Sequence, residues 1–409
     1  MKKAVLLLCF CFSLTSLLAS TIKIEVNAGD FARKDCIVAA DVAKMNLTKN
    51  NGVVLFEKVD GEKRPVECQL VWADGKNPVL YWVLDGDTPA GASRYFVASS
   101  TDTVDQSGSM TVKDTNEALV LSKDGKAVLQ YNYTTTFPPE GVHPAYRRSG
   151  YIHPAYSPSG NVLTRIQPRD HYHHYGIWNP WTRVEYDGKM YDLWNLRDMK
   201  GTVRARGYDR TYQGDICAGY KAHLYHYIFT PEGEKAIMDE TWNVKAYNLE
   251  GGFLWDFESE LHPSTDLPVI LRAYRYAGFG WRGPQEWTRH NSEMFTSEGN
   301  TRQQIDGTNV RWIYVTGQCD NGRSGLLFMS HPQNRKAPEP VRIWDENANG
   351  GRGDTFIGLC PTKNEDWTLE AGGRYKLCYR VLSYDGEMTK ERADRLWNDF
   401  ANPPIVKVK

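Results

Sequence analysis

The densest group of chemically active side chains lies at residues 169–181, which read Arg-Asp-His-Tyr-His-His-Tyr-Gly-Ile-Trp-Asn-Pro-Trp. Three of the ten histidines of the chain, His171, His173 and His174, fall within four positions. Imidazole titrates near neutral pH, so each ring could act as a general acid or base. In a strand, His171 and His173 would share one face and His174 would lie on the other. We predict a functional site here; the alternative is a set of structural hydrogen bonds in an aromatic core.

The same spacing raises the question of a metal. Two imidazoles on one strand face, His171 and His173, are a workable pair of ligands for zinc, copper or iron. No third ligand is identified by spacing. A divalent metal therefore stays open as a cofactor, beside chemistry that needs none.

A second polar group lies just upstream of the histidines. Arg147, Tyr151 and His153 occur among proline and glycine residues, which predicts a loop. Polar groups on loops often contact ligands, and arginine can hold a carboxylate with two hydrogen bonds. Tyr151 or His153 could donate a proton. A solvated, aromatic surface loop is the alternative.

A third segment, residues 278–287, combines glycines with Trp281, Arg282 and Glu286. A tryptophan face, a cation and a carboxyl group could form the wall of a sugar subsite. A glycine-rich bulge with packed tryptophans is the alternative. His331, in a His-Pro-Gln-Asn-Arg segment, has a similar but weaker character.

Three carboxylates, Asp256, Glu258 and Glu260, alternate along one predicted strand. Glycoside hydrolysis uses two carboxyl groups about 5 to 10 Å apart, and alternate strand residues are about 7 Å apart. Three acids on one face more often mark the solvent side of a sheet, so we do not place the site here.

The elements around these residues are nearly all strands. Runs of five to seven apolar-alternating residues, separated by Asp-Gly and similar turns, predict hairpins throughout the chain. We expect an all-β fold with a small N-terminal β-sandwich (21–105), a polar linker (101–109) and a large antiparallel β-sandwich (110–402). One helix is predicted at 389–401, where Asn-Pro-Pro stops it.

The N-terminus predicts the compartment. Two lysines precede an apolar run that ends in Ala-Ser, which indicates a signal peptide at residues 1–20. We therefore expect an exported protein, periplasmic or extracellular, and no later run is long enough to cross a bilayer. A net charge of −1 without a basic block argues against nucleic acid as a partner. Six cysteines follow the predicted signal, and free thiols and disulfides both stay open.

The chain resembles an exported bacterial family of unknown function whose members are labelled "methane oxygenase PmoA-like". The matching motifs are Tyr151-Ile-His-Pro, Leu163-Thr-Arg165, Asp170-His-Tyr-His-His174, Gly176-Ile-Trp178, Gly280-Trp-Arg-Gly283, Ser297-Glu-Gly299, His331-Pro332 and Asp385-Gly386. A membrane monooxygenase subunit would need spanning helices that this sequence lacks. Here Tyr175 stands where a basic residue is usual in the family.

The resemblance implies sugar chemistry by analogy of fold. The strand-rich part of the family is similar to the supersandwich of galactose mutarotases and related lyases and hydrolases, and its members occur in bacteria that dismantle polysaccharides. We expect a secreted carbohydrate-active enzyme that acts on an oligosaccharide or polysaccharide fragment by hydrolysis, β-elimination or epimerisation, with a histidine as general acid or base. Two alternatives stay open: a non-catalytic glycan-binding β-sandwich, and a histidine-metal-dependent oxidoreductase.

Roles follow for the candidate residues of that enzyme. His173 or His174 would move the proton, and Arg147, Arg169 or Arg282 would hold an acidic or hydroxyl-rich substrate. The rings that would stack on sugars are those of Trp178, Trp181 and Trp281.

Overall fold

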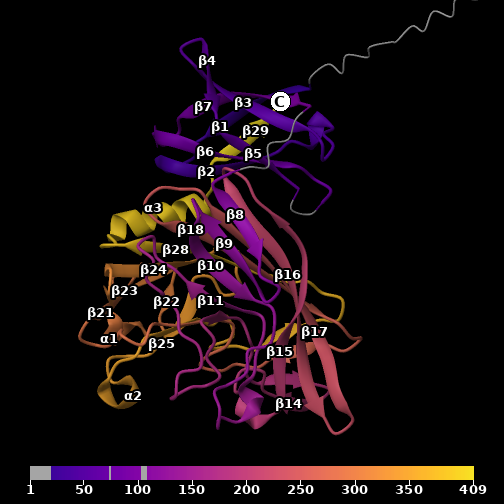
Figure 1. Ribbon diagram of the computed structural model, residues 1–409, viewed down its shortest axis with the longest axis vertical. Helices are drawn as coiled ribbons and strands as arrows, with labels where there is room; N and C mark the ends of the chain where they lie inside the picture. Colours follow the sequence, from indigo (N-terminus) through magenta and orange to yellow (C-terminus); the bar gives the residue numbers. More distant parts are fainter. Residues whose placement is uncertain (1–19, 73–74, 103–107) are drawn as a thin grey trace, which may run out of the picture.

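The computed structural model describes residues 20–72, 75–102 and 108–409. Residues 1–19 of the predicted signal peptide and residues 103–107 of the predicted linker lie outside this part of the chain. Within it the protein is all-β, as predicted, with a smaller group of N-terminal strands at one end of a larger body (Figure 1). None of its helices is long and apolar enough to span a membrane.

Two sheets form the N-terminal sandwich. The five-stranded sheet has the order β29 (Ile405–Val408), β1 (Thr21–Asn27), β7 (Ser93–Thr101), β3 (Gly52–Val59) and β4 (Glu62–Val66). The three-stranded sheet has the order β2 (Arg33–Asp41), β6 (Val79–Thr88) and β5 (Cys68–Val71). Apolar residues at alternate positions, such as Ile22, Ile24 and Val26, face a shared core with Trp82 and Phe96. The last strand of the chain, β29, pairs with the first, which the sequence did not indicate.

Two large antiparallel sheets enclose the main core. The nine-stranded sheet has the order β22 (Asn309–Val310), β25 (Glu339–Ile343), β26 (Phe356–Leu359), β20 (Phe279–Arg282), β12 (Ile177–Trp178), β11 (Tyr151–Ala155), β10 (Lys126–Asn132), β9 (Ala118–Lys123) and β8 (Met110–Asp114). The eight-stranded sheet has the order β15 (Gly201–Tyr212), β16 (Cys217–Thr230), β17 (Gly233–Tyr247), β18 (Phe253–Pro263), β28 (Tyr375–Asp385), β24 (Gly322–Ser330), β23 (Trp312–Cys319) and β21 (Ser292–Thr296). A four-stranded sheet adds β14 (Lys189–Tyr191), β13 (Val184–Tyr186), β19 (Val269–Leu271) and β27 (Trp367–Leu369).

The register of the nine-stranded sheet decides which residues leave the core. Ile152, Ile177, Trp281 and Ile357 are paired across β11, β12, β20 and β26, and all four face the main core. Since side chains alternate along a strand, their chain neighbours face the other way. The second face therefore carries Tyr151, Trp178, Arg282 and Phe356, from strands far apart in the sequence.

Helices are few and short. The predicted C-terminal helix is confirmed as α3 (Lys390–Ala401), and the Thr389 side chain caps it by accepting the Arg392 N–H at 3.2 Å. It packs beside the N-terminal sandwich, where Arg33 and Asp399 form a buried ion pair at 2.9 Å. The remaining helices are single turns: α1 (Arg302–Ile305), α2 (Ala348–Gly351) and the 3₁₀ turns η1 (Ala43–Met45), η2 (Pro144–Tyr146) and η3 (Leu196–Asp198). Figure 1 shows α2 at the end of the molecule remote from the N-terminal strands.

Candidate functional site

The histidine segment is a turn, so the two-face arrangement that a strand would have given does not occur. The His174 N–H donates to the carbonyl of His171 at 2.9 Å, which folds the chain back on itself. Gly176 has φ 60°, and a Cβ at this position would lie 2.3 Å from the carbonyl oxygen of Ile152. The three rings consequently gather into one cluster, with centroids 4.8 to 5.3 Å apart, instead of dividing between two faces.

Aromatic rings on the second face of the nine-stranded sheet form the floor of this cluster. The ring of His174 is 3% exposed and stacks on Phe356, with centroids 5.2 Å apart. The ring centroid of Trp178 lies 5.0 Å from that of His174, and the ring centroid of Trp344 lies 4.7 Å from that of His171. Trp344 is only half-buried, whereas Trp178 is fully buried. Among these rings, Trp344 is thus the tryptophan that presents a face beside His171.

The stacking roles predicted for three tryptophans need correction. Trp178, Trp181 and Trp281 are each 0% exposed. Trp181 and Trp281 belong to the main core, and the indole N–H of Trp281 donates to the carbonyl of Leu163 at 2.9 Å. The alternation of β20 turns Trp281 inward and Arg282 outward, so these two neighbours serve opposite faces.

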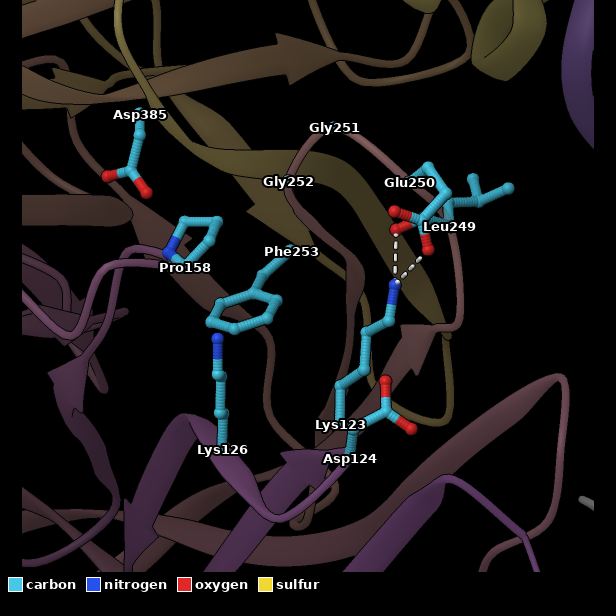
Figure 2. Close-up of a pocket in the computed structure, with 10 residues that line it drawn as sticks. All are labelled: Lys123, Asp124, Lys126, Pro158, Leu249, Glu250, Gly251, Gly252, Phe253 and Asp385. Atoms are coloured by element: carbon cyan, nitrogen blue, oxygen red, sulfur yellow. Dashed lines mark hydrogen bonds and ion pairs between the residues drawn. The ribbon is translucent and has the colours of Figure 1, made fainter.

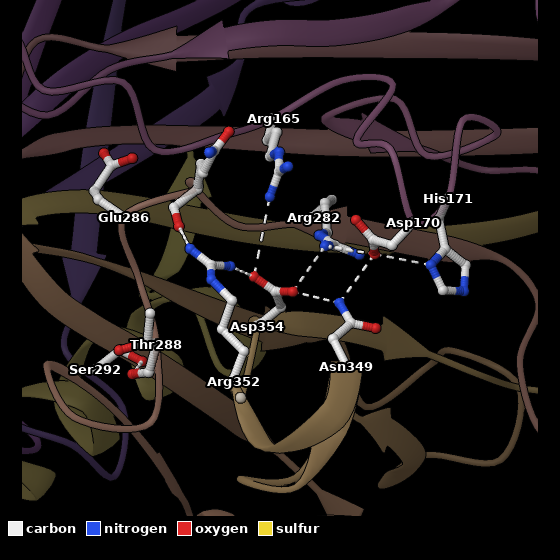
Figure 3. A network of polar contacts seen from close by, with 12 residues as sticks. Arg165, Asp170, His171, Arg282, Glu286, Thr288, Ser292, Asn349, Arg352 and Asp354 are labelled. Atoms are coloured by element: carbon white, nitrogen blue, oxygen red, sulfur yellow. Dashed lines mark hydrogen bonds and ion pairs between the residues drawn. The ribbon is translucent and has the colours of Figure 1, made fainter. Parts of the chain in front are cut away.

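His171 is held by a carboxylate. Its Nδ1 lies 2.9 Å from Oδ2 of Asp170, and the same oxygen accepts from Arg282 Nη2 at 2.8 Å and from Asn349 Nδ2 at 3.0 Å (Figure 3). The Arg282 side chain is fully buried, while His171 is 33% exposed and Asp170 is 27% exposed. The Asp170–His171 pair is therefore held on one side by the buried Arg282 and is accessible to solvent on the other.

A second carboxylate, Asp354, is surrounded by arginines. Arg282 Nη2 lies 3.5 Å from its Oδ2, Arg165 Nη1 lies 4.0 Å from its Oδ1, and Arg352 contacts it directly. Figure 3 shows the three guanidinium groups converging on it from three segments of the chain. Asn349 also donates to Asp354, so this residue joins the two carboxylates.

Burial sets the protonation states. Burial and the nearby charges of His171, Arg148 and Arg282 lower the pKa of His173 to about 3. The pKa of His174 lies well below its ordinary value for the same reasons. Burial alone would raise the pKa of Asp170, but the hydrogen bond from His171 and the charge of Arg282 outweigh it and hold this pKa well below its ordinary value. Near neutral pH, His173 and His174 are therefore neutral and Asp170 is ionised.

Tyr151 and His153 lie on strand β11, so the loop predicted for them is wrong. The Tyr151 hydroxyl is 2.5 Å from Thr136 Oγ1, and its ring contacts Tyr175 with centroids 4.8 Å apart. His153 Nδ1 lies 2.8 Å from Thr164 Oγ1, and burial lowers the pKa of His153 to about 4. Both side chains therefore lie on the second face of the nine-stranded sheet, where they are held by hydrogen bonds to threonine.

The remaining candidates do not all join the cluster. Arg147, Arg169 and Glu286 are exposed. Burial lowers the pKa of Arg165, and the nearby charge of Glu286 partly opposes that shift. His331 packs against Phe400 of α3, with centroids 5.0 Å apart, and so belongs to a different part of the fold.

The three alternating acids on β18 are each engaged by a basic residue. Asp256 pairs with Arg380 at 2.6 Å, and the two other pairs are Glu258–Lys376 at 3.1 Å and Glu260–Arg374 at 2.5 Å. These contacts account for all three carboxylates as structural ion pairs.

The described residues include no group of three or more histidine, cysteine, aspartate or glutamate side chains arranged to hold a metal ion. The predicted pair of His171 and His173 thus has no third ligand of these types in this part of the chain. The six cysteines from Cys36 to Cys378 are all free thiols.

A pocket of about 390 Å³ lies elsewhere, between the β9–β10 turn, the β17–β18 turn and the end of β28 (Figure 2). Lys123 crosses one side of it and donates to the carbonyl of Leu249 at 2.8 Å. Asp385 on the opposite side accepts from Ser159 and Ser324. None of the residues predicted for the site lines this pocket, and two of its charged groups, Lys123 and Glu250, form an ion pair at 3.2 Å.

Sequence reasoning missed five residues of the cluster: Arg165, Trp344, Asn349, Arg352 and Asp354. Arg165 does fall in one of the family motifs. The other four lie in a segment whose local sequence resembles an ordinary loop, and only the fold brings it to Asp170, 179 residues away from Asn349.

The described chain is thus an antiparallel β-sandwich protein with a histidine, arginine and aspartate cluster on one face of its nine-stranded sheet. It belongs to a family of unknown function, DUF6807, whose model matches residues 118–398. This match covers the cluster and most of both large sheets. The family description does not include the methane-oxygenase label.

Comparison with other proteins gives only remote likenesses. No curated protein matches the chain. A glycosyl hydrolase family 38 protein from Enterococcus faecalis is 6% identical with a TM-score of 0.48, and the match covers 96% of this chain but 48% of that protein. A galactose mutarotase related enzyme from Lactobacillus acidophilus is 9% identical with a TM-score of 0.34, covering 68% of this chain and 99% of the other. A galactose mutarotase-like protein from Lactobacillus casei is 10% identical with a TM-score of 0.32, covering 67% and 100%.

Proposed function

We propose that this protein is a carbohydrate-active enzyme in which His171 moves a proton to or from a sugar. The observation that carries the proposal is the contact between Asp170 and Nδ1 of His171 at 2.9 Å. An ionised carboxylate accepts the Nδ1–H, which leaves Nε2 as the nitrogen that can take a proton. Arg282 and Asn349 fix the carboxylate, so the imidazole is oriented before a substrate arrives.

The geometry favours proton abstraction, as in epimerisation or β-elimination, over hydrolysis by two carboxyl groups. Such hydrolysis needs one carboxyl group in its protonated form to donate a proton to the leaving oxygen. Asp170 and Asp354 both contact arginine, which favours the ionised form of a carboxyl group. Of the three reaction classes expected from the sequence, hydrolysis therefore fits this cluster least well.

The neighbouring groups suit a sugar. His173 is neutral over the physiological pH range because its pKa is about 3, so it can donate or accept a hydrogen bond from a hydroxyl group without taking a charge. Trp344 offers a half-buried aromatic face 4.7 Å from His171. We assign to Trp344 the stacking role that the sequence suggested for Trp178. The substrate would be an oligosaccharide fragment that an exported protein meets outside the cytoplasm.

A non-catalytic glycan-binding protein is the second candidate. It would use the same aromatic and polar groups, yet it would not need a carboxylate that orients one imidazole. The fixed pair of Asp170 and His171 therefore favours the enzyme.

The test compares two aspartate–histidine pairs in one protein. Asp209 and His223 also form such a pair, at 2.6 Å through Nε2, with a histidine as exposed as His171 but on the β15–β16 hairpin outside the cluster. Mature wild-type protein, His171→Asn and His223→Asn would be incubated with a panel of oligosaccharides. Mass spectrometry would detect cleavage, and NMR would detect epimers. We expect His171→Asn to lower turnover by about 100-fold or more, because general acid–base catalysis contributes at least that factor.

His223→Asn should leave turnover unchanged. Cleavage with gain of water, independent of His171, would refute the proton-abstraction class. Glycan binding without turnover in the wild type would make the protein a binding module.

A further inference from the structure

Four guanidinium groups gather around the cluster: Arg165, Arg282 and Arg352 around Asp354, and Arg148 near the histidines. The carboxylates among them are those of Asp170, Asp354, the exposed Glu286, and Asp192, whose charge acts on Arg148. Asp170 and Asp354 are already in contact with arginine, so the question is which guanidinium group is left without an acceptor.

Arg148 is buried and acts on the neighbouring histidines. It is 2% exposed, it donates to the carbonyl of Leu193 at 3.0 Å, and it forms no ion pair within 4.0 Å among residues 20–72, 75–102 and 108–409. A buried charge is screened less than one at the surface, so its field reaches the neighbouring rings. His173 and His174 both respond to it with a lower pKa.

Arg165 is the guanidinium with unused hydrogen-bonding capacity. Its side chain is 18% exposed, and its nearest carboxylate oxygen, on Asp354, is 4.0 Å away. No acceptor in the described part of the chain receives a hydrogen bond from its guanidinium group, although this group carries five N–H donors. Its backbone is fixed, because Arg165 N–H donates to Arg282 and Gly176 N–H donates to Arg165. A solvent-accessible guanidinium group on a rigid backbone, with no acceptor from the described residues, is free to bind an acceptor on a ligand in place of water.

We propose that Arg165 binds a carboxylate of the substrate, so that the enzyme acts on uronate-containing saccharides. This inference rests on the proposed function and narrows its substrate class. A planar guanidinium group matches a carboxylate with two parallel hydrogen bonds, which a neutral hydroxymethyl group cannot accept. Arg352 and Arg282 lie beside Arg165 around the same carboxylate, Asp354 (Figure 3). Once Arg165 has neutralised the carboxylate charge, the adjacent C–H bond becomes more acidic, and Nε2 of His171 would take its proton. The electron pair left on carbon then either expels the oxygen substituent of the next carbon, which takes up a proton, or takes a proton back on the opposite face.

The test uses three ligands of equal length and linkage: an oligouronate, its methyl ester and the corresponding neutral oligosaccharide. Affinity would be measured by titration calorimetry for the wild type, Arg165→Gln and Arg165→Lys. We expect the wild type to bind the oligouronate about 10- to 100-fold more tightly than the ester, as for one charge-assisted hydrogen-bonded pair. Arg165→Gln should remove this difference, and Arg165→Lys should restore part of it because it keeps the charge without the planar fork.

A control arginine lies on β15. Arg204 is bound to Glu234 through its Nη1 and Nη2 atoms, so Arg204→Gln should leave all three affinities unchanged. Equal affinity of the wild type for oligouronate and ester would overturn the proposal. An equal loss for all three ligands in Arg165→Gln would overturn it as well, since the arginine would then be structural. If a sulfated saccharide bound more tightly than the uronate, the proposal would be overturned, because the group that Arg165 binds would be a sulfate and not a carboxylate.

The two proposals can fail separately. Turnover that depends on His171 but shows no preference for uronates would support the proposed enzyme and refute carboxylate binding by Arg165. Uronate binding that depends on Arg165, without turnover of any saccharide, would keep the role of Arg165 in binding and refute the proposed catalysis by His171.

Discussion

Glu339 provides a prediction whose magnitude follows from its surroundings. It lies on β25 and is 0% exposed. Its Oε1 accepts from the Tyr379 hydroxyl at 2.9 Å, and its Oε2 accepts from Asn334 Nδ2 at 3.0 Å and contacts Ser330. Burial raises the pKa of Glu339 from an ordinary 4.5 to about 7 and outweighs these three hydrogen bonds, which lower it.

The raised pKa makes the folded state bind a proton that the unfolded state releases. The contribution to stability is fully present below pH 4.5 and is lost progressively as the pH rises toward 7. One pKa unit corresponds to about 1.4 kcal/mol, so the loss amounts to about 3 kcal/mol by pH 8. Glu339→Gln keeps a neutral, hydrogen-bonding side chain of the same shape and removes the titration.

Urea unfolding followed by tryptophan fluorescence would measure this loss at several pH values from 4.5 to 8. We expect the stability of Glu339→Gln relative to the wild type to rise by about 3 kcal/mol across this range. Glu250→Gln is the control, because the Glu250 side chain is 96% exposed. A stability difference between Glu339→Gln and the wild type that does not change with pH would refute the reasoning.

Three further variants test other parts of the fold. Asp170→Asn should lower turnover by about 100-fold or more without loss of structure, measured by kinetics and circular dichroism, because His171 loses its orienting carboxylate. Asp399→Asn should lower the free energy of unfolding by about 3 kcal/mol, measured in urea, because it leaves the Arg33 charge buried and unpaired. Gly176→Ala should cost at least about 1 kcal/mol in the same assay, because φ is 60° and the added Cβ would meet a backbone oxygen 2.3 Å away. If a variant kept the turnover or the unfolding free energy of the wild type, the contact from which its effect was predicted would be contradicted.

Local patterns in the sequence were enough for the strands and the C-terminal helix. Alternating apolar residues predicted β1, and the spacing before Asn402 predicted α3. These signals work because burial of a strand or helix face depends on neighbours a few positions away. The same local reasoning failed at His171 to His174, where turn hydrogen bonds replace strand pairing.

The sequence by itself determined that this is a β-rich chain with an unusual concentration of histidine and aromatic residues. Only the tertiary structure decided which of them meet. Trp281 and Arg282 are adjacent in the sequence, yet the pleat of β20 sends one to the core and the other to the cluster. Asp170 meets Arg282 from 112 residues away and Asn349 from 179 residues away. Such contacts depend on the register of several strands at once, because a shift of one residue in any of them would turn its side chains to the opposite face.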